Sequence, residues 1–165
     1  MIAAVLWLGL GLAADDTLLA PTLADFDRSL ARAERLIEAS HDEGVRLGLA
    51  QSAWIDVGCL TGPCDPTRAA SVAVQVQEAG HHDRELIQGA RAELLRLRRI
   101  SVEQTVAPLV DSTRRARMAA AQARATVAAN TWSVRVAWYE RFIAPWVAGH
   151  SAAVAAACVP PKAAL

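Results

Sequence analysis

Two long stretches of the chain repeat apolar residues every three or four positions, the spacing that places them on one face of an α-helix. The first predicted helix runs from about Thr22 to Val57 and the second from Pro66 to about Arg98. Both apolar seams have the heptad-like spacing of packed helices, so the pattern predicts an antiparallel helical hairpin. The seam positions of the first helix are Leu23, Phe26, Leu30, Ala33, Ile37, Ser40, Gly44, Leu47, Gln51 and Trp54. Those of the second are Ala69, Val72, Val76, Ala79, Asp83, Leu86, Ala90 and Leu97.

The two seams can be aligned by folding the hairpin midway between Cys59 and Cys64. Large apolar residues then face each other at several levels; for example, Ile37 faces Leu86. The polar interruptions also coincide, because Ser40 faces Asp83. This shared polar level is the strongest sequence argument for the hairpin, since a buried polar group needs a hydrogen-bonding partner.

The tip of the predicted hairpin contains Cys59 and Cys64 on either side of a short segment with a Gly-Pro pair, which ends helices. Asp65 can cap the next helix, and Pro66 suits its first position, where a missing N–H costs nothing. Four residues between two cysteines is not a usual zinc or redox spacing. We expect a Cys59–Cys64 disulfide, with two free buried thiols as the alternative.

The rest of the chain is also expected to be helical. We place a second turn at Arg98–Ser101, and Pro108 should kink the next helix or delay its start. An alanine-rich third helix then runs to about Asn130 or beyond. Segment 131–159 is expected to bend near Asn130 or Pro145 and to fold back as a fourth helix. The predicted fold class is all-α: an antiparallel helical hairpin extended to a three- or four-helix bundle.

The N-terminal segment Met1–Ala14 is apolar throughout and is followed by Asp15 and Asp16. Small residues precede this acidic pair, as they do at signal-peptidase sites, although no Lys or Arg precedes the apolar run. We predict a signal peptide at 1–14, a single helical domain at 15–159, a disordered tail at 160–165, and a periplasmic or secreted location. The alternative is a short apolar helix packed on the body.

The net charge and the missing motifs reduce the number of function classes that the sequence supports. Lys and Arg total 17 and Asp and Glu total 17, so the net charge is zero and a nucleic-acid partner is not indicated. No Gly-x-Ser-x-Gly elbow, haem-attachment motif or phosphate-binding glycine loop is present, so neither an enzyme nor a cofactor is expected. Segment 142–159 lacks Asp, Glu, Lys and Arg. Membrane contact through it is a weaker interpretation than a core-packed helix, since alanine is barely apolar.

A polar layer in the middle of the hairpin is a candidate binding site. His41, His82 and Asp83 lie at nearly the same level, and imidazoles and carboxylates on facing helices are how bundles hold metals or small ligands. The alternative is a polar layer that only fixes the register of the helices.

A second candidate site is an interaction surface. Arginines gather after the second helix, whereas acidic residues gather on the first helix, so the two groups either complement each other within the molecule or bind an acidic partner. The residues proposed for this surface are Arg98, Arg99, Arg114, Arg115, Trp138 and Trp146.

Together these features favour an exported, non-enzymatic helical-bundle protein that acts by contact with an unidentified protein. The alternative is a metal- or small-ligand-binding bundle that uses the layer around His41 and His82. Cys158 either pairs between chains or stays free, and a homo-oligomer is compatible with the sequence.

Overall fold

The computed structural model describes residues 20–58 and 64–157, and this part of the chain is all-α, as predicted. The elements are α1 (Leu23–Asp56), α2 (Pro66–Val102), a short 3₁₀ helix η1 (Ala107–Leu109), α3 (Ser112–Phe142) and α4 (Ala144–Ala157). The predicted signal peptide, Cys59, Cys158 and the tail at 160–165 lie outside the described residues. The signal peptide and the Cys59–Cys64 disulfide therefore stay predictions.

Local sequence signals set the helix ends around the hairpin. Thr22 forms a capping box with Asp25, in which each side chain bonds the other residue's backbone N–H. Gly58 ends α1 with φ of 80°, a left-handed conformation that glycine adopts without steric cost. Asp65 caps α2 by accepting hydrogen bonds from the first free backbone N–H groups, and Pro66 opens that helix, as expected.

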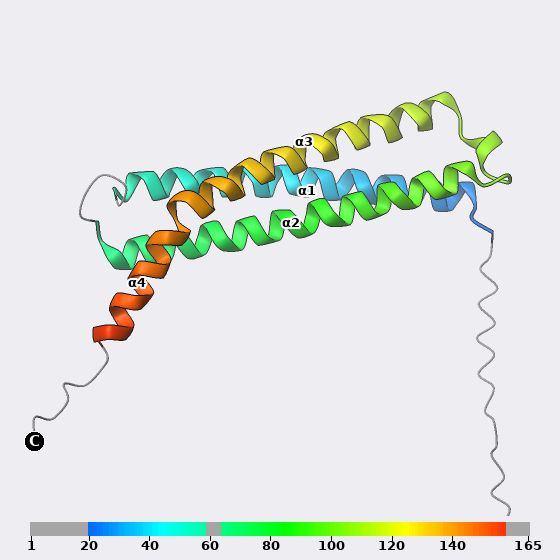
Figure 1. Ribbon diagram of the computed structural model, residues 1–165. Helices are drawn as coiled ribbons and strands as arrows, with labels where there is room; N and C mark the ends of the chain where they lie inside the picture. The colour runs from blue at the N-terminus through cyan, green and yellow to red at the C-terminus, as the bar shows by residue number, and fades with distance from the viewer. Residues whose placement is uncertain (1–19, 59–63, 158–165) are drawn as a thin grey trace, which may run out of the picture.

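α1 and α2 run side by side in opposite directions (Figure 1). Ser40 Oγ donates a 2.6 Å hydrogen bond to Asp83 Oδ1, which confirms the predicted pairing of the polar level. α3 lies along the hairpin, packing against both α1 and α2. α3 continues to Phe142, and α4 follows after a bend at Ile143, close to the bend predicted near Pro145. The expected folding back is wrong, because α4 leads away from the body at the hairpin tip (Figure 1).

The second turn differs from the prediction. α2 continues through Arg98–Ser101 to Val102, so these residues form its last turns rather than a loop. Ile100 is only 5% exposed, and burying it against the core prolongs the helix beyond the arginines. Asp111 caps the next helix, with its side chain accepting a hydrogen bond from the Arg114 backbone N–H. Pro108 lies in η1, so it delays the start of α3, one of the two effects expected of it.

Two apolar clusters form the core, one on each side of the polar layer. The cluster at the second-turn end contains Phe26, Leu30, Ala33, Ile37, Ala90, Leu94, Leu97, Ile100, Val106, Val110, Ala121 and Ala125. The cluster at the hairpin tip contains Leu47, Ala50, Trp54, Ala69, Val72, Ala73, Val76, Ala79 and Ile143. Ser40, Glu43 and Asp83 are buried at the level that separates them.

The predicted seam of α2 is wrong at Leu86 but correct at Ala90 and Leu97, which are both buried in the core. Ile87 is 5% exposed, whereas Leu86 is only half-buried, so Ile87 takes the buried position that was expected for Leu86. α2 packs against α3 as well as α1: Leu94 lines a surface depression together with Ala125 of α3. A helix with two neighbours buries a broader stripe than the single seam read from the sequence.

Candidate functional site

The polar layer contains a buried carboxylate. Asp83 and Ser40 are each 3% exposed, and the Ser40 hydroxyl satisfies one oxygen of the Asp83 carboxylate. Burial raises the pKa of Asp83 above its usual value, because a charged carboxylate loses hydration inside the protein. The Ser40 hydrogen bond and the positive charge of Arg135 oppose this rise in pKa. Asp83 is therefore held in an environment that penalises its charge.

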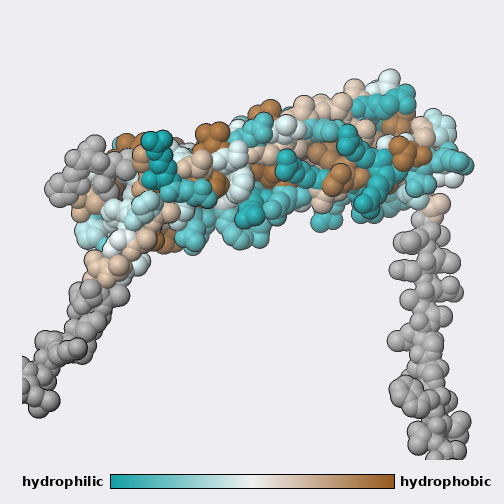
Figure 2. Space-filling model, in the orientation of Figure 1, coloured by the Kyte–Doolittle hydropathy of each residue, from teal (hydrophilic) through white to brown (hydrophobic). Residues whose placement is uncertain are grey.

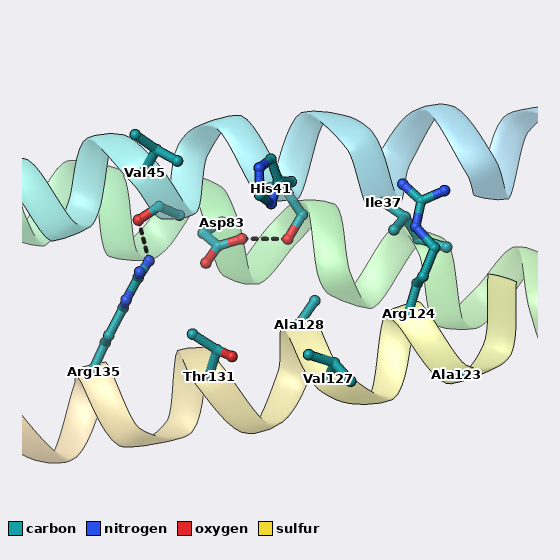
Figure 3. A pocket seen from close by; sticks show the side chains of 12 residues that line it. Ile37, His41, Val45, Asp83, Ala123, Arg124, Val127, Ala128, Thr131 and Arg135 are labelled. Atoms are coloured by element: carbon teal, nitrogen blue, oxygen red, sulfur yellow. Dashed lines mark hydrogen bonds between the residues drawn. The ribbon is translucent and has the colours of Figure 1, made fainter. Parts of the chain in front are cut away.

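Arg135 reaches this layer from α3 and lies on the backbone of α1. Its Nη1 donates to the carbonyl oxygen of Gly44 (Figure 3). A Cβ on Gly44 would stand 3.0 Å from Nη1, and a Cβ on Gly48 would stand 3.5 Å from Nη2. Gly44 and Gly48, one turn apart, thus form a notch that the guanidinium occupies. Gln51 of α1 makes a second contact with α3 here, because its side-chain amide donates a hydrogen bond to the Arg135 backbone carbonyl at 3.0 Å.

A pocket of about 390 Å³ opens between the three long helices beside this notch. Figure 3 shows side chains of α1 and α3 facing each other across it, with Asp83 of α2 between them and Arg135 at one end. Its lining consists of Ile37, Ser40, His41, Gly44, Val45, Asp83, Ala123, Arg124, Val127, Ala128, Thr131 and Arg135. The pocket combines apolar walls with a small number of polar groups, the usual composition of a small-molecule site.

The structure places the three predicted metal ligands differently. His41 lines the pocket but is exposed, whereas His82 points to Glu43, with its Nδ1 3.3 Å from Glu43 Oε2. Asp83 follows His82 on α2 and points about 100° away from it, so Asp83 faces inward while His82 is exposed. In residues 20–58 and 64–157, no three His, Cys, Asp or Glu side chains are grouped so as to hold a metal ion. The described residues thus show no three-ligand metal site, and metal binding stays an untested prediction, while Asp83 and His41 line the pocket.

Part of the predicted arginine surface is used within the molecule. The Arg114 guanidinium contacts Asp27 at 2.8 Å and Asp111 at 2.7 Å. Its hydrogen bond lowers the pKa of Asp27, whereas the pKa of Asp111 is lowered chiefly by the hydrogen bond from the Arg114 backbone N–H, with the guanidinium adding to the effect. The neighbouring pairs Arg117–Glu34 and Arg124–Glu38 join α3 to α1 in the same way, at 2.6 and 2.7 Å. The charges of the two helices thus complement each other.

The remaining surface arginines lie apart from these pairs. Arg98, Arg99 and Arg115 are exposed, and no ion pair involves them in the part of the chain that the structure describes. These three side chains are available to an acidic surface. Arg98 and Arg99 lie on α2 and Arg115 lies on α3, so the three do not share one helix face.

The aromatic residues of α3 and α4 pack at the hairpin tip. The Trp146 ring meets the fully buried Trp54 edge-on, with centroids 5.1 Å apart, and stacks on His150 at 4.9 Å. Trp138 contacts Phe142 at 5.4 Å and packs against the tip cluster. Both predicted surface tryptophans are thus partly buried, and they anchor the start of α4 rather than extend into solvent.

Sequence reasoning did not identify Arg135, Thr131 or Val127 as site residues. The one signal in the sequence was the Gly44–Gly48 spacing, because glycines one helical turn apart leave room for a neighbouring chain to approach.

None of the helices in the described part of the chain is long and apolar enough to span a bilayer. No known protein family, curated protein or solved structure matches this chain.

Proposed function

We propose that this chain is an exported, non-enzymatic helical-bundle protein that acts through contact with another protein. The observation that carries the proposal is α4, which leaves the body beyond Ile143 (Figure 1). Ile143 is fully buried and Trp146 packs on Trp54, so the first turn of α4 is packed against the body. Further along, Ala148, Gly149 and residues 151–153 are exposed.

α4 has a surface suited to a protein partner. It contains no Asp, Glu, Lys or Arg, and its surface is pale rather than teal, whereas the body shows teal and brown residues side by side (Figure 2). Depletion of charge is typical of the centre of protein interfaces. A helix of 14 residues is marginal in water without tertiary packing, and residues 151–153 of α4 are exposed rather than packed on the body. A partner with an apolar groove would supply it, and small side chains would allow close approach.

Site-specific photo-crosslinking tests the contact. A photoreactive phenylalanine analogue is placed at Ala152 on α4, and at the exposed Gln88 on α2 as the matched control, in the full chain made in cells. We expect a crosslinked product of one discrete mass from position 152 and none from position 88. A product of twice the chain's mass identifies a second copy as the partner. Equal labelling at both positions, or no product at position 152, refutes contact through α4.

Export is tested separately by intact mass. The apolar segment up to Ala14 and the acidic pair after it motivate this part of the proposal. The protein recovered from the envelope or medium should lack residues up to Ala13 or Ala14. Full-length protein in the cytoplasm contradicts the export proposal and leaves the crosslinking test of α4 unaffected.

A further inference from the structure

Two opposite charges face the pocket of the polar layer without an ion-pair partner in the described residues. Asp83 is 3% exposed, and no side chain in the ranges 20–58 and 64–157 donates to its second oxygen, Oδ2. Arg135 is half-buried, and its Nη1 bonds a neutral carbonyl, that of Gly44. Asp83 Oδ2 and Arg135 Nη1 approach the same point, the position of a Cβ on Gly44, to 4.0 and 3.0 Å. The two charges therefore lie within reach of one small molecule.

The other polar groups of the pocket have different roles. Arg124 is paired with Glu38 at 2.7 Å, and Ser40 is committed to Asp83 Oδ1. His41 and Thr131 also line the pocket, but both are exposed. Asp83 and Arg135 are thus the two groups of the pocket with both charge and bonding capacity to offer.

The walls between these charges are apolar. Ile37 and Val45 come from α1, and Val127 and Ala128 come from α3. Val45 is 51% and Val127 65% exposed, so an apolar group placed between them would remove both from water. The volume of about 390 Å³ is in the lower part of the range of small-molecule sites.

We propose that this pocket binds a free α-amino acid with an apolar side chain. Its ammonium group contacts Asp83 Oδ2, its carboxylate contacts the Arg135 guanidinium, and its side chain lies between Val45 and Val127. A ligand with only one charge would leave the opposite protein charge desolvated and unpaired, which is costly. The zwitterion satisfies both charges, and Arg135 can hold a carboxylate through its planar set of donors. The inference does not depend on the proposed role of α4.

Isothermal titration calorimetry on the full chain tests the proposal with three probes that share the same apolar side chain. L-leucine carries both charges, 3-methylbutylamine lacks the carboxylate, and 4-methylpentanoate lacks the ammonium group. Leucine should bind saturably at one site, and each analogue at least about tenfold more weakly, since each loses a charge-assisted hydrogen bond. An analogue that binds as tightly as leucine overturns the zwitterion assignment. A lack of saturable heat with leucine, valine and phenylalanine at millimolar concentration overturns the site.

Variants locate the binding within the molecule. Asp83→Asn and Arg135→Gln should each weaken leucine binding at least about tenfold. Arg115→Gln removes an exposed arginine from the same helix as Arg135 and should leave leucine binding unchanged. Val127→Trp fills the pocket from an exposed position, so it should abolish binding while the circular dichroism and melting temperature stay unchanged. Leucine binding to a folded Val127→Trp variant with unchanged affinity refutes the pocket as the site.

Discussion

Replacing Gly44 by alanine tests whether Arg135 occupies the α1 notch. In a helix interior, alanine is more favourable than glycine by about 1 kcal/mol, so the change would stabilise a helix with open space around it. The new Cβ would stand 3.0 Å from Arg135 Nη1, and the guanidinium would have to withdraw by a few tenths of an ångström. This withdrawal weakens the hydrogen bond from Arg135 to the Gly44 carbonyl.

The matched control is Gly48→Ala, one turn further along α1. There the new Cβ would be 3.5 Å from Nη2, an ordinary contact, so the full stabilisation of about 1 kcal/mol is expected. A hydrogen bond with a charged partner contributes roughly 1.5–3 kcal/mol, and losing part of it at Gly44 should cancel the gain from alanine. Gly44→Ala should therefore be close to neutral, and the two variants should differ by about 1 kcal/mol.

Urea denaturation gives both free energies of unfolding, and a double-mutant cycle with Arg135→Met assigns the difference. In the Arg135→Met background Gly44→Ala should stabilise by about 1 kcal/mol, because no guanidinium remains to be displaced. Equal stabilisation by Gly44→Ala and Gly48→Ala in the parent chain would refute the notch. An unchanged effect of Gly44→Ala after removal of Arg135 would do the same.

Three further predictions follow from burial and position. Ile87→Ala should lower the free energy of unfolding by about 2–5 kcal/mol in urea denaturation, whereas Leu86→Ala should cost less than half as much, since Leu86 is only half-buried; the reverse order would contradict the structure. Burial raises the pKa of Asp83 in the folded protein above the value near 3.8 that it has in the unfolded chain. Ionised Asp83 therefore destabilises the fold increasingly as the pH rises above that unfolded pKa. Asp83→Asn should accordingly raise the melting temperature at pH 8, with an advantage that shrinks toward pH 4, and a pH-independent difference would contradict this. Non-reducing peptide mapping should show Cys59 linked to Cys64, and a dominant link to the third cysteine would argue against the stapled tip.

The sequence alone determined the hairpin and the residues at which its two helices begin. Thr22 with Asp25, and Asp65 with Pro66, are local signals, because a cap acts on backbone groups within one turn of itself. The pairing of Ser40 with Asp83 was also predictable, since two polar breaks in two apolar seams can be buried only if they meet.

The tertiary structure alone decided the position of α3 and thereby the site. α3 buries only Ala121 and Ala125 among its described residues, so its alanine-rich pattern favours no single face and gives no register. Ion pairs from α3 to α1 and the fit of Arg135 into the Gly44–Gly48 notch fix that register instead. These contacts join residues far apart in sequence. A periodic pattern specifies which face of a helix is buried, but it does not specify which distant side chain will lie against it.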